Sequence, residues 1–435
     1  MEVRELRFVR PRTIVGLGLF LLATALPLLR QTGLHSWQTV FAEDGRIYTQ
    51  QALRHGALAS LLHGYAGYLQ LAPRLLALAV PLVPLRDLSV YAAVAGTVVT
   101  ALAALFVYRE TRSWIRWVPL RLAVASLVVL MPALGAENTA NMTNVIWVVA
   151  ATAPWALLSL EEGRWDTLAR ASAAFLAATS TALSVIFVPL AVAGVVIRRT
   201  RSAVTVAGAF VMGLVVQGLV VVASQDTTLP RSSSSVAQLR DEVGVHVFAV
   251  FLLGTRWIPS LWRANWRATA LVPTLVVVAL FAVLFPGAGR RAQAVAGVLL
   301  GYALVAFLFV DLGRGTRLMG LRELTPYSGG SERYSVIPVF FMACAAAVLV
   351  DPRGEGGRRR VARIAAPLLI AQVALVTIIS FPTRTIRSDG PDWRASMANT
   401  YAHDCHHVAS PRLVRVATNG MGTFMVTLPC HDLRP

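Results

Sequence analysis

The stretch Thr13–Leu29, TIVGLGLFLLATALPLL, decides the fold of this chain. It is apolar almost throughout, and roughly 20 residues of helix cross the ~30 Å hydrocarbon core of a bilayer. No small-residue cleavage site follows it, so we expect a retained membrane helix rather than a cleaved signal peptide. A basic leader precedes it, formed by Arg4, Arg7, Arg10 and Arg12. Because basic residues concentrate on the cytoplasmic side, the N-terminus is expected in the cytoplasm.

The composition extends this prediction to the whole chain. Of 435 residues, 56% are hydrophobic and 14% are charged, which is typical of a polytopic membrane protein. The formal charge of +18 comes from arginine, because the sequence contains no lysine. The arginines cluster in short loops between apolar runs, as cytoplasmic loops require. We therefore expect membrane lipids, and no nucleic acid, as partners.

About eleven membrane spans are predicted, which gives an all-α polytopic fold. They cover residues 13–29, 88–108, 119–135, 145–160, a broken pair at 168–180 and 183–197, 202–224, 268–286, 292–311, 335–350 and 362–381. Two further apolar stretches, Tyr68–Pro84 and His246–Trp262, contain proline and arginine. Since a charge at bilayer depth costs about 2.5–3.5 kcal/mol, both are expected to lie along the interface or to dip partway into the membrane instead of crossing it.

Two adjacent carboxylates follow the first span, in Phe41-Ala-Glu-Asp-Gly-Arg-Ile-Tyr48. Glu43 and Asp44 are expected close to the outer membrane surface. A carboxylate there can take a proton from a sugar hydroxyl while a lipid-borne substrate approaches from the membrane. The alternative is that both acids are solvated loop residues or cap a helix. They are the candidate catalytic residues.

The same outer loop continues with polar and aromatic residues between small ones. Four of them are candidates for acceptor binding: His63, Tyr65, Tyr68 and Gln70. The tyrosines also fit ordinary interfacial anchors. Arg74 follows them, and an interfacial arginine beside an acid-bearing loop is a candidate ligand for a lipid phosphate.

A compact polar loop separates the spans that end at 135 and begin at 145. Glu137, Asn141 and Asn144 in this loop are predicted to orient acceptor hydroxyls, provided that it faces the same cavity as Asp44. The alternative is helix capping by asparagine.

Several arginines lie on the expected outer side, although basic residues usually concentrate on the cytoplasmic side. Their position therefore needs another explanation. Guanidinium groups bind phosphate oxygens bidentately, so we predict a donor-phosphate site. Its candidates are Arg333 with Tyr334 beside it, and then Arg256, Arg314 and Arg317.

Residues 1–381 are predicted to form a transmembrane domain, and residues 382–435 a small outer tail. Cys405 and Cys430 in the tail are expected to pair, because the outer compartment is oxidising. The tail also contains a cluster of histidine and aspartate at residues 403–407. Its spacing matches no closed zinc site, so no metal site is predicted.

These features together resemble the GT-C glycosyltransferases, integral membrane enzymes that use polyprenyl-phosphate sugars as donors. The likeness rests on Glu43-Asp44, Pro73-Arg74, the loop 137–144 and Glu332-Arg333-Tyr334 at the start of a late span. The resemblance implies that Asp44 is the general base, Glu43 a supporting acid and Arg333 a phosphate ligand. Many members carry an aspartate in the second outer loop, where this chain has Glu137.

The resemblance also implies a multi-pass plasma-membrane enzyme with an extracytoplasmic C-terminus, and the lysine-free coding is similar to that of actinobacterial envelope enzymes. Its donor would be a polyprenyl-phosphate sugar and its acceptor an envelope glycan or glycolipid, with inversion at the anomeric carbon. No cofactor is required if arginines neutralise the phosphate, although a divalent cation is compatible with this chemistry. A transporter or flippase of a lipid-linked glycan, and a glycan ligase or polymerase, are the alternatives.

Overall fold

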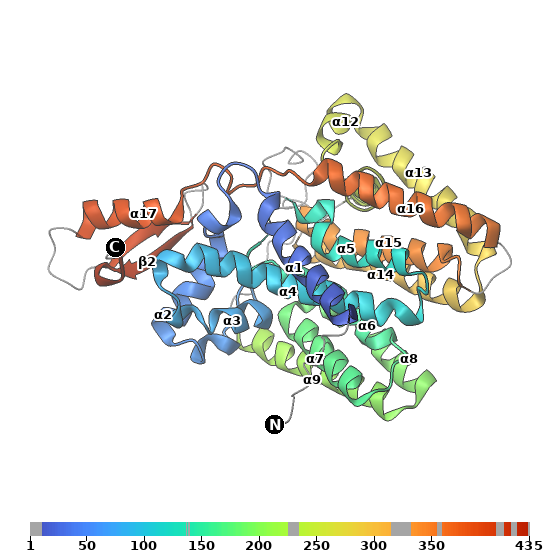
Figure 1. Cartoon of the computed structure of the whole chain (residues 1–435), viewed down its shortest axis with the longest axis horizontal. Coiled ribbons are helices and arrows are strands. Elements are labelled where there is room, and N and C mark those ends of the chain that lie inside the picture. Colours follow the sequence, from blue (N-terminus) through green and yellow to red (C-terminus); the bar gives the residue numbers. More distant parts are fainter. Residues whose placement is uncertain are drawn as a thin grey trace, which may run out of the picture.

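The computed structural model describes residues 11–135, 137, 140–224, 235–314, 332–354, 359–405, 413–418 and 424–433. This part of the chain is mainly helical (Figure 1). The helices of the main bundle overlap the predicted spans. They are α1 (Pro11–Arg30), α4 (Leu88–Glu110), α5 (Val118–Leu130), α6 (Val145–Leu158), α7 (Arg164–Ser180), α8 (Val188–Arg198), α9 (Arg201–Ala223), α13 (Trp266–Leu284), α14 (Arg290–Arg314), α15 (Val336–Val350) and α16 (Arg359–Ser380).

Six helical segments of the described chain are long and apolar enough to cross a membrane. They are Leu85–Ser113, Arg201–Ala223, Trp266–Gly287, Arg290–Asp311, Arg333–Val350 and Arg360–Ser380. Their surfaces carry exposed apolar side chains such as Leu219, Leu275 and Leu368, as contact with lipid requires. The other apolar helices are shorter, and they include Ile14–Arg30 and Val145–Leu158. By length and composition, the chain is a helical membrane protein.

Both stretches that were expected not to span are interrupted. Tyr68–Pro84 contains α3 (Leu71–Ala77), whose 7 residues measure only about 10 Å at 1.5 Å per residue. His246–Trp262 is interrupted at Gly254. Before this glycine, α11 (Val250–Leu253) ends a helical run that begins with α10 (Val236–Val243) and continues through Gly244–Ala249, and after it lies α12 (Ile258–Ala264).

The bundle is built around α15. Its sequence, VIPVFFMACAAAVLV, is apolar on every face, and a helix of that kind is buried on all sides. Every residue of α15 is buried, and the helix packs against α5, α6, α14 and α16. The turn at its N-terminal end, Glu332–Ser335, is therefore attached to a completely buried helix.

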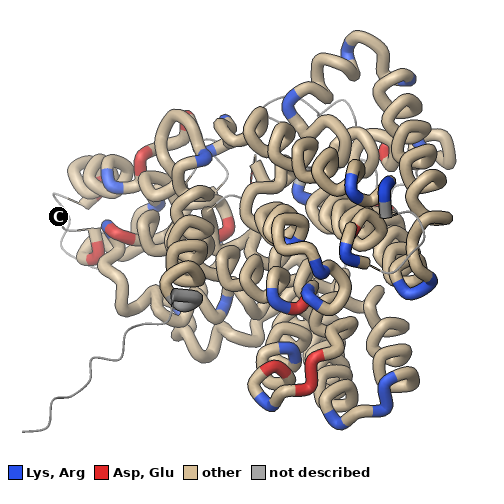
Figure 2. The backbone as a smooth tube through the Cα atoms, turned by 45° about the vertical axis from the view of Figure 1, so that its right-hand side comes forward, with Lys and Arg blue, Asp and Glu red and all other residues tan. Residues whose placement is uncertain are grey.

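Charged residues lie mainly near the ends of the helices (Figure 2). At one end, which we call the paired end, arginines meet acids from neighbouring turns. Arg109 pairs with Asp166, and Arg112 pairs with Glu161 at 2.6 Å. These contacts join the turn after α4 to the turn between α6 and α7.

The opposite end, which we call the cavity end, collects the other set of turns. Arg30 at the end of α1 donates to the carbonyl of Met131 at 2.9 Å and to the carbonyl of Ser380 at 3.3 Å. The backbone of Thr32 donates to the carbonyl of Thr383 at 2.9 Å. The first loop, the second loop and the start of the tail therefore meet at one end of the bundle.

The first loop and the tail share a second hydrophobic core, and we call this unit the cap. It contains α2 (Gln50–His55), α3, α17 (Trp393–Thr400) and the antiparallel hairpin of β1 (Leu413–Ala417) and β2 (Met425–Pro429). Its core joins Tyr48 of the first loop to Trp393 and Val426 of the tail. Cys405 and Cys430 form the predicted disulfide.

The cap adds two features that the sequence did not indicate. The buried side chains of the described part of the tail pack against the first loop, so one hydrophobic core extends across the predicted boundary at residue 381. The hairpin is a small β element in a chain that is otherwise mainly helical, as predicted. Its strands bury alternate residues such as Val414 and Val416, a period-two pattern typical of a half-buried strand.

Candidate active site

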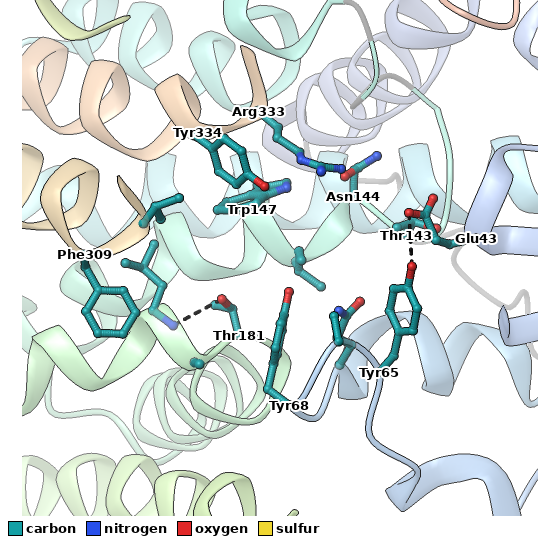
Figure 3. Close-up of a pocket in the computed structure, with 16 residues that line it drawn as sticks. Glu43, Tyr65, Tyr68, Thr143, Asn144, Trp147, Thr181, Phe309, Arg333 and Tyr334 are labelled. Atoms are coloured by element: carbon teal, nitrogen blue, oxygen red, sulfur yellow. Dashed lines mark hydrogen bonds between the residues drawn. The ribbon is translucent and has the colours of Figure 1, made fainter. Parts of the chain in front are cut away.

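A cavity of about 320 Å³ lies at the cavity end, between the cap and the bundle (Figure 3). Seven of the predicted site residues line it, namely Glu43, Tyr65, Tyr68, Gln70, Asn144, Arg333 and Tyr334. Its remaining lining comes from Ala66 of the first loop, the second loop, the start of α6, the turn after α7 and the end of α14. Segments far apart in the sequence therefore form one site.

Glu43 supplies the carboxylate of the cavity. It directly precedes the helical turn Asp44–Thr49, and its Oε1 accepts a hydrogen bond of 3.5 Å from the hydroxyl of Tyr65. Its Oε2 is buried and has no hydrogen-bond partner among the described residues. A carboxylate with one long hydrogen bond and one open oxygen is suited to accept a proton from a bound hydroxyl.

Asp44 lies beneath the cavity and does not line it. Its fully buried carboxylate accepts hydrogen bonds from the backbone of Met142 at 3.0 Å, and from the backbone and hydroxyl of Thr143 at 2.8 and 2.6 Å. Burial raises the pKa of Asp44 to about 6, although these hydrogen bonds and the charge of Arg387 act in the opposite direction. The expectation that Asp44 faces the cavity was wrong. Its carboxylate instead fastens the second loop to the first.

Arg333 supplies the positive charge of the cavity. It lies in the turn before α15, and its Nη1 is 3.4 Å from Oε2 of Glu137. Its guanidinium lies 5.2 Å from the centre of the Tyr334 ring, which in turn meets Trp147 edge to face at 5.6 Å. Figure 3 shows the guanidinium directed toward Asn144. Glu137 does not line the cavity itself, but it holds the arginine that does.

The second loop is held closely against α4. A Cβ added at Gly96 would lie 2.2 Å from the carbonyl oxygen of Asn141, so only glycine permits this approach. Asn141 is buried and bonds within the loop, because its Nδ2 donates to the carbonyl of Glu137 at 2.6 Å and its Oδ1 accepts from the backbone of Asn144 at 2.8 Å. The prediction that Asn141 contacts an acceptor was therefore wrong, because its side chain stabilises the loop instead. Asn144, in contrast, lines the cavity.

Gln70 presents a fixed amide to the cavity. Its Oε1 accepts a hydrogen bond from the hydroxyl of Tyr48, which leaves the amide nitrogen as the group available to a ligand. Arg74 lies behind this pair, with its guanidinium 5.6 Å from the centre of the Tyr48 ring. It is buried and donates to Gln51 at 2.9 Å and to the carbonyl of Ser60 at 2.7 Å. The expectation that Arg74 binds phosphate was wrong, because its side chain is enclosed by the cap.

Four other predicted residues lie away from the cavity or outside the described side chains. His63 is exposed on the cap, where its ring meets the ring of His55 at 5.5 Å. Arg256 donates to the carbonyl of Ile379 at 2.9 Å. The predictions that His63 binds the acceptor and that Arg256 binds the donor phosphate were therefore wrong, because neither residue lines the cavity. The side chain of Arg314 and all of Arg317 lie outside the described structure.

The far side of the cavity is apolar, and the sequence had not predicted it. Leu183, Phe309 and Val310 line this side, and Figure 3 shows Phe309 across the cavity from Glu43. Thr181 ends α7 and accepts a hydrogen bond of 3.3 Å from the backbone of Leu183. The predicted break between residues 180 and 183 could have indicated this side of the cavity, because a helix that stops in the middle of a bundle opens space for a ligand.

Within the described ranges, no group of three or more histidine, cysteine, aspartate or glutamate side chains is arranged to hold a metal ion. We therefore assign no metal ligands. The positive charge available to a bound anion comes from Arg333.

The fold and the cavity define a helical membrane protein with a two-sided pocket, polar on one side and apolar on the other. Comparison with protein-family models and with curated proteins finds no match.

Proposed function

We propose that this protein is a GT-C-type membrane glycosyltransferase. It transfers a sugar from a polyprenyl-phosphate donor to a hydroxyl of an envelope glycan or glycolipid. The observation that supports this proposal most is the order of the groups along one cavity. The carboxylate of Glu43 and the guanidinium of Arg333 are followed by the apolar surface around Phe309. A polyprenyl-phosphate sugar carries hydroxyls, phosphate and hydrocarbon in the same order.

Glu43 acts as the general base in this proposal. Its open oxygen takes the proton of the acceptor hydroxyl as the hydroxyl oxygen attacks the anomeric carbon of the donor. The bond between that carbon and the phosphate oxygen breaks, and the lipid phosphate leaves with the electron pair. General-base catalysis of this kind contributes about 10²- to 10⁴-fold to a rate.

Arg333 stabilises the leaving phosphate. Its 3.4 Å contact with Glu137 is long for an ion pair, and the bidentate hydrogen bonds of a guanidinium to phosphate are shorter and stronger. The donor phosphate thus competes well for Arg333. Tyr65, Tyr68, Gln70 and Asn144 are left to bind the sugar and the acceptor.

In the membrane, we infer eleven spans in the plasma membrane with the N-terminus in the cytoplasm. The paired end then faces the cytoplasm, where Arg109, Arg112 and Arg198 satisfy the preference for inward positive charge. The cavity end and the tail face outward, where the disulfide of Cys405 and Cys430 is stable.

The test is sugar transfer by purified protein from a panel of polyprenyl-phosphate sugars to envelope-glycan acceptors. The wild type is expected to transfer one of them, and Glu43→Gln to reduce the rate at least a hundredfold with the donor still bound. Glu162→Gln, which changes an exposed acid far from the cavity, serves as the matched control. Donor binding without transfer by the wild type would favour a flippase instead.

The anomeric configuration of the product gives a second test of the mechanism. Direct attack by the acceptor predicts inversion relative to the donor, which nuclear magnetic resonance of the product measures. Retention would exclude a single displacement.

A further inference from the structure

A second cavity lies on the membrane-facing side of α1, α4 and α5, whose labels are adjacent in Figure 1. It has a volume of about 130 Å³ and is lined by apolar side chains together with Tyr108 and Ser126. Ser126 is satisfied within α5, since its hydroxyl donates to the carbonyl of Ala123 at 2.8 Å. The rim is exposed and apolar, with Leu22 52% and Leu122 39% accessible. This groove opens toward the hydrocarbon of the bilayer.

One end of the groove carries a positive charge. Arg121 lies one turn into α5, and its guanidinium is 4.8 Å from the centre of the Tyr108 ring. Its Nη2 donates to the hydroxyl of Tyr108 over a long 3.4 Å. Its Nε is buried and has no hydrogen-bond partner in the part of the chain that the structure describes. Tyr108 directly precedes Arg109, so this charge lies near the paired end.

Arg121 lacks a counter-ion in the described structure. Two acids of the paired end are already held by other arginines, Asp166 by Arg109 and Glu161 by Arg112, and no described carboxylate pairs with Arg121. An arginine near the end of a membrane helix lies at the level of the lipid headgroups, where anionic lipids attract it. A phosphate is the anion that a membrane supplies, and it fits the fork of donors on a guanidinium.

We propose that this groove binds one anionic phospholipid, with its phosphate on Arg121 and one acyl chain between α1, α4 and α5. The volume fits a segment of a single chain, because pockets for drug-sized ligands are larger, about 300–1,000 Å³. A zwitterionic lipid is a poorer ligand, since its ammonium group competes for the same phosphate. This site lies toward the opposite end from the proposed active site and is independent of that function.

The test measures lipid retention by the purified full-length protein, using native mass spectrometry and the shift in Tm on adding phosphatidylglycerol or phosphatidylcholine. The wild type is expected to retain one phosphatidylglycerol and to prefer it over phosphatidylcholine. Arg121→Gln is expected to weaken this binding about tenfold or more, the effect of losing a charge-assisted contact. Arg201→Gln, an exposed arginine at the start of α9, is the matched control and should bind like the wild type.

A second variant tests the groove separately from the charge. Ala23 lines the groove, so Ala23→Phe should fill it and remove the retained lipid while Arg121 is intact. Equal retention by Arg121→Gln and Arg201→Gln, or an unchanged affinity in Ala23→Phe, would overturn the proposal. Protection by inorganic phosphate as strong as that by phosphatidylglycerol would also overturn it, because it would show a free-anion site.

Discussion

The two ends of the helical bundle differ in the surroundings of their acids. At the paired end, acids meet arginines directly, as in the contacts of Arg109 with Asp166 and of Arg112 with Glu161. At the cavity end, Glu43 has no ion-pair partner within the described residues, and Oε2 of this residue has no hydrogen bond. Paired charges stabilise a fold and need no ligand, whereas an open carboxylate in a cavity is available for chemistry. The proposed function rests on this difference.

The largest expected effect is a difference in the rate of sugar transfer between a variant of a cavity arginine and a variant of a paired-end arginine. Arg333→Gln should lower sugar transfer by about 10²- to 10³-fold, the usual loss when one donor to a developing anion is removed. Arg112→Gln removes an exposed ion pair with Glu161, which is worth at most about 1 kcal/mol, and should leave transfer unchanged. The rate of transfer at saturating donor measures both. Equal losses in the two variants would contradict the assignment of Arg333.

A smaller effect, on stability, is expected for Asp44, which does not line the cavity. Asp44→Ala deletes the acceptor for Met142 and Thr143 and leaves the charge of Arg387 without its anion. We expect a loss of about 3 kcal/mol in the free energy of unfolding, the cost of breaking a buried charged contact. Thermal unfolding in detergent measures this loss. A variant as stable as the wild type would show that this contact does not fasten the loops.

The pKa of Asp44 gives a pH dependence with a defined sign. Burial raises this pKa from 3.8 to about 6, so the folded state holds the proton more tightly than the unfolded chain. The stabilisation is complete below about pH 4 and is lost as the pH rises through about 6. We expect Tm of the wild type to fall across this window and Tm of Asp44→Asn to change less. Parallel curves for the two proteins would contradict the raised pKa.

The smallest expected effect concerns the residue that positions Gln70. Tyr48→Phe removes the hydrogen bond to the Gln70 amide and should raise KM about three- to tenfold, with kcat within about twofold, because one neutral hydrogen bond contributes about 0.5–1.5 kcal/mol. Tyr91→Phe is the control, since the hydroxyl of Tyr91 donates to the carbonyl of Leu76 on the cap and not to Gln70. Equal KM values for both variants would remove Tyr48 from substrate positioning.

The sequence predicted the helices well, because long apolar runs such as Val336–Val350 allow few other structures. It also predicted the disulfide, and it predicted that an acid of the first loop would meet Arg333 in one cavity. The acid expected there was Asp44, whereas the structure places Glu43 there. The sequence did not predict the hairpin of β1 and β2, which lies in a polar tail where short strands have weak signals.

The sequence could not decide which of two adjacent acids faces the cavity. Neighbouring side chains on a helical turn point about 100° apart, so only one of Glu43 and Asp44 can enter the same space. The outcome depends on the amides of Met142 and Thr143, which the fold brings to Asp44 from the second loop. The burial of Arg74 could not be predicted from the sequence for the same reason, because it depends on contacts with Gln51 and Ser60.

The most direct measurement is a structure of the purified protein with a non-transferable phosphonate analogue of a polyprenyl-phosphate sugar. We predict that the phosphonate lies within hydrogen-bond distance of Arg333, the sugar beside Glu43 and the first prenyl units against Phe309. An analogue bound elsewhere on the protein, or with its sugar remote from Glu43, would contradict the account.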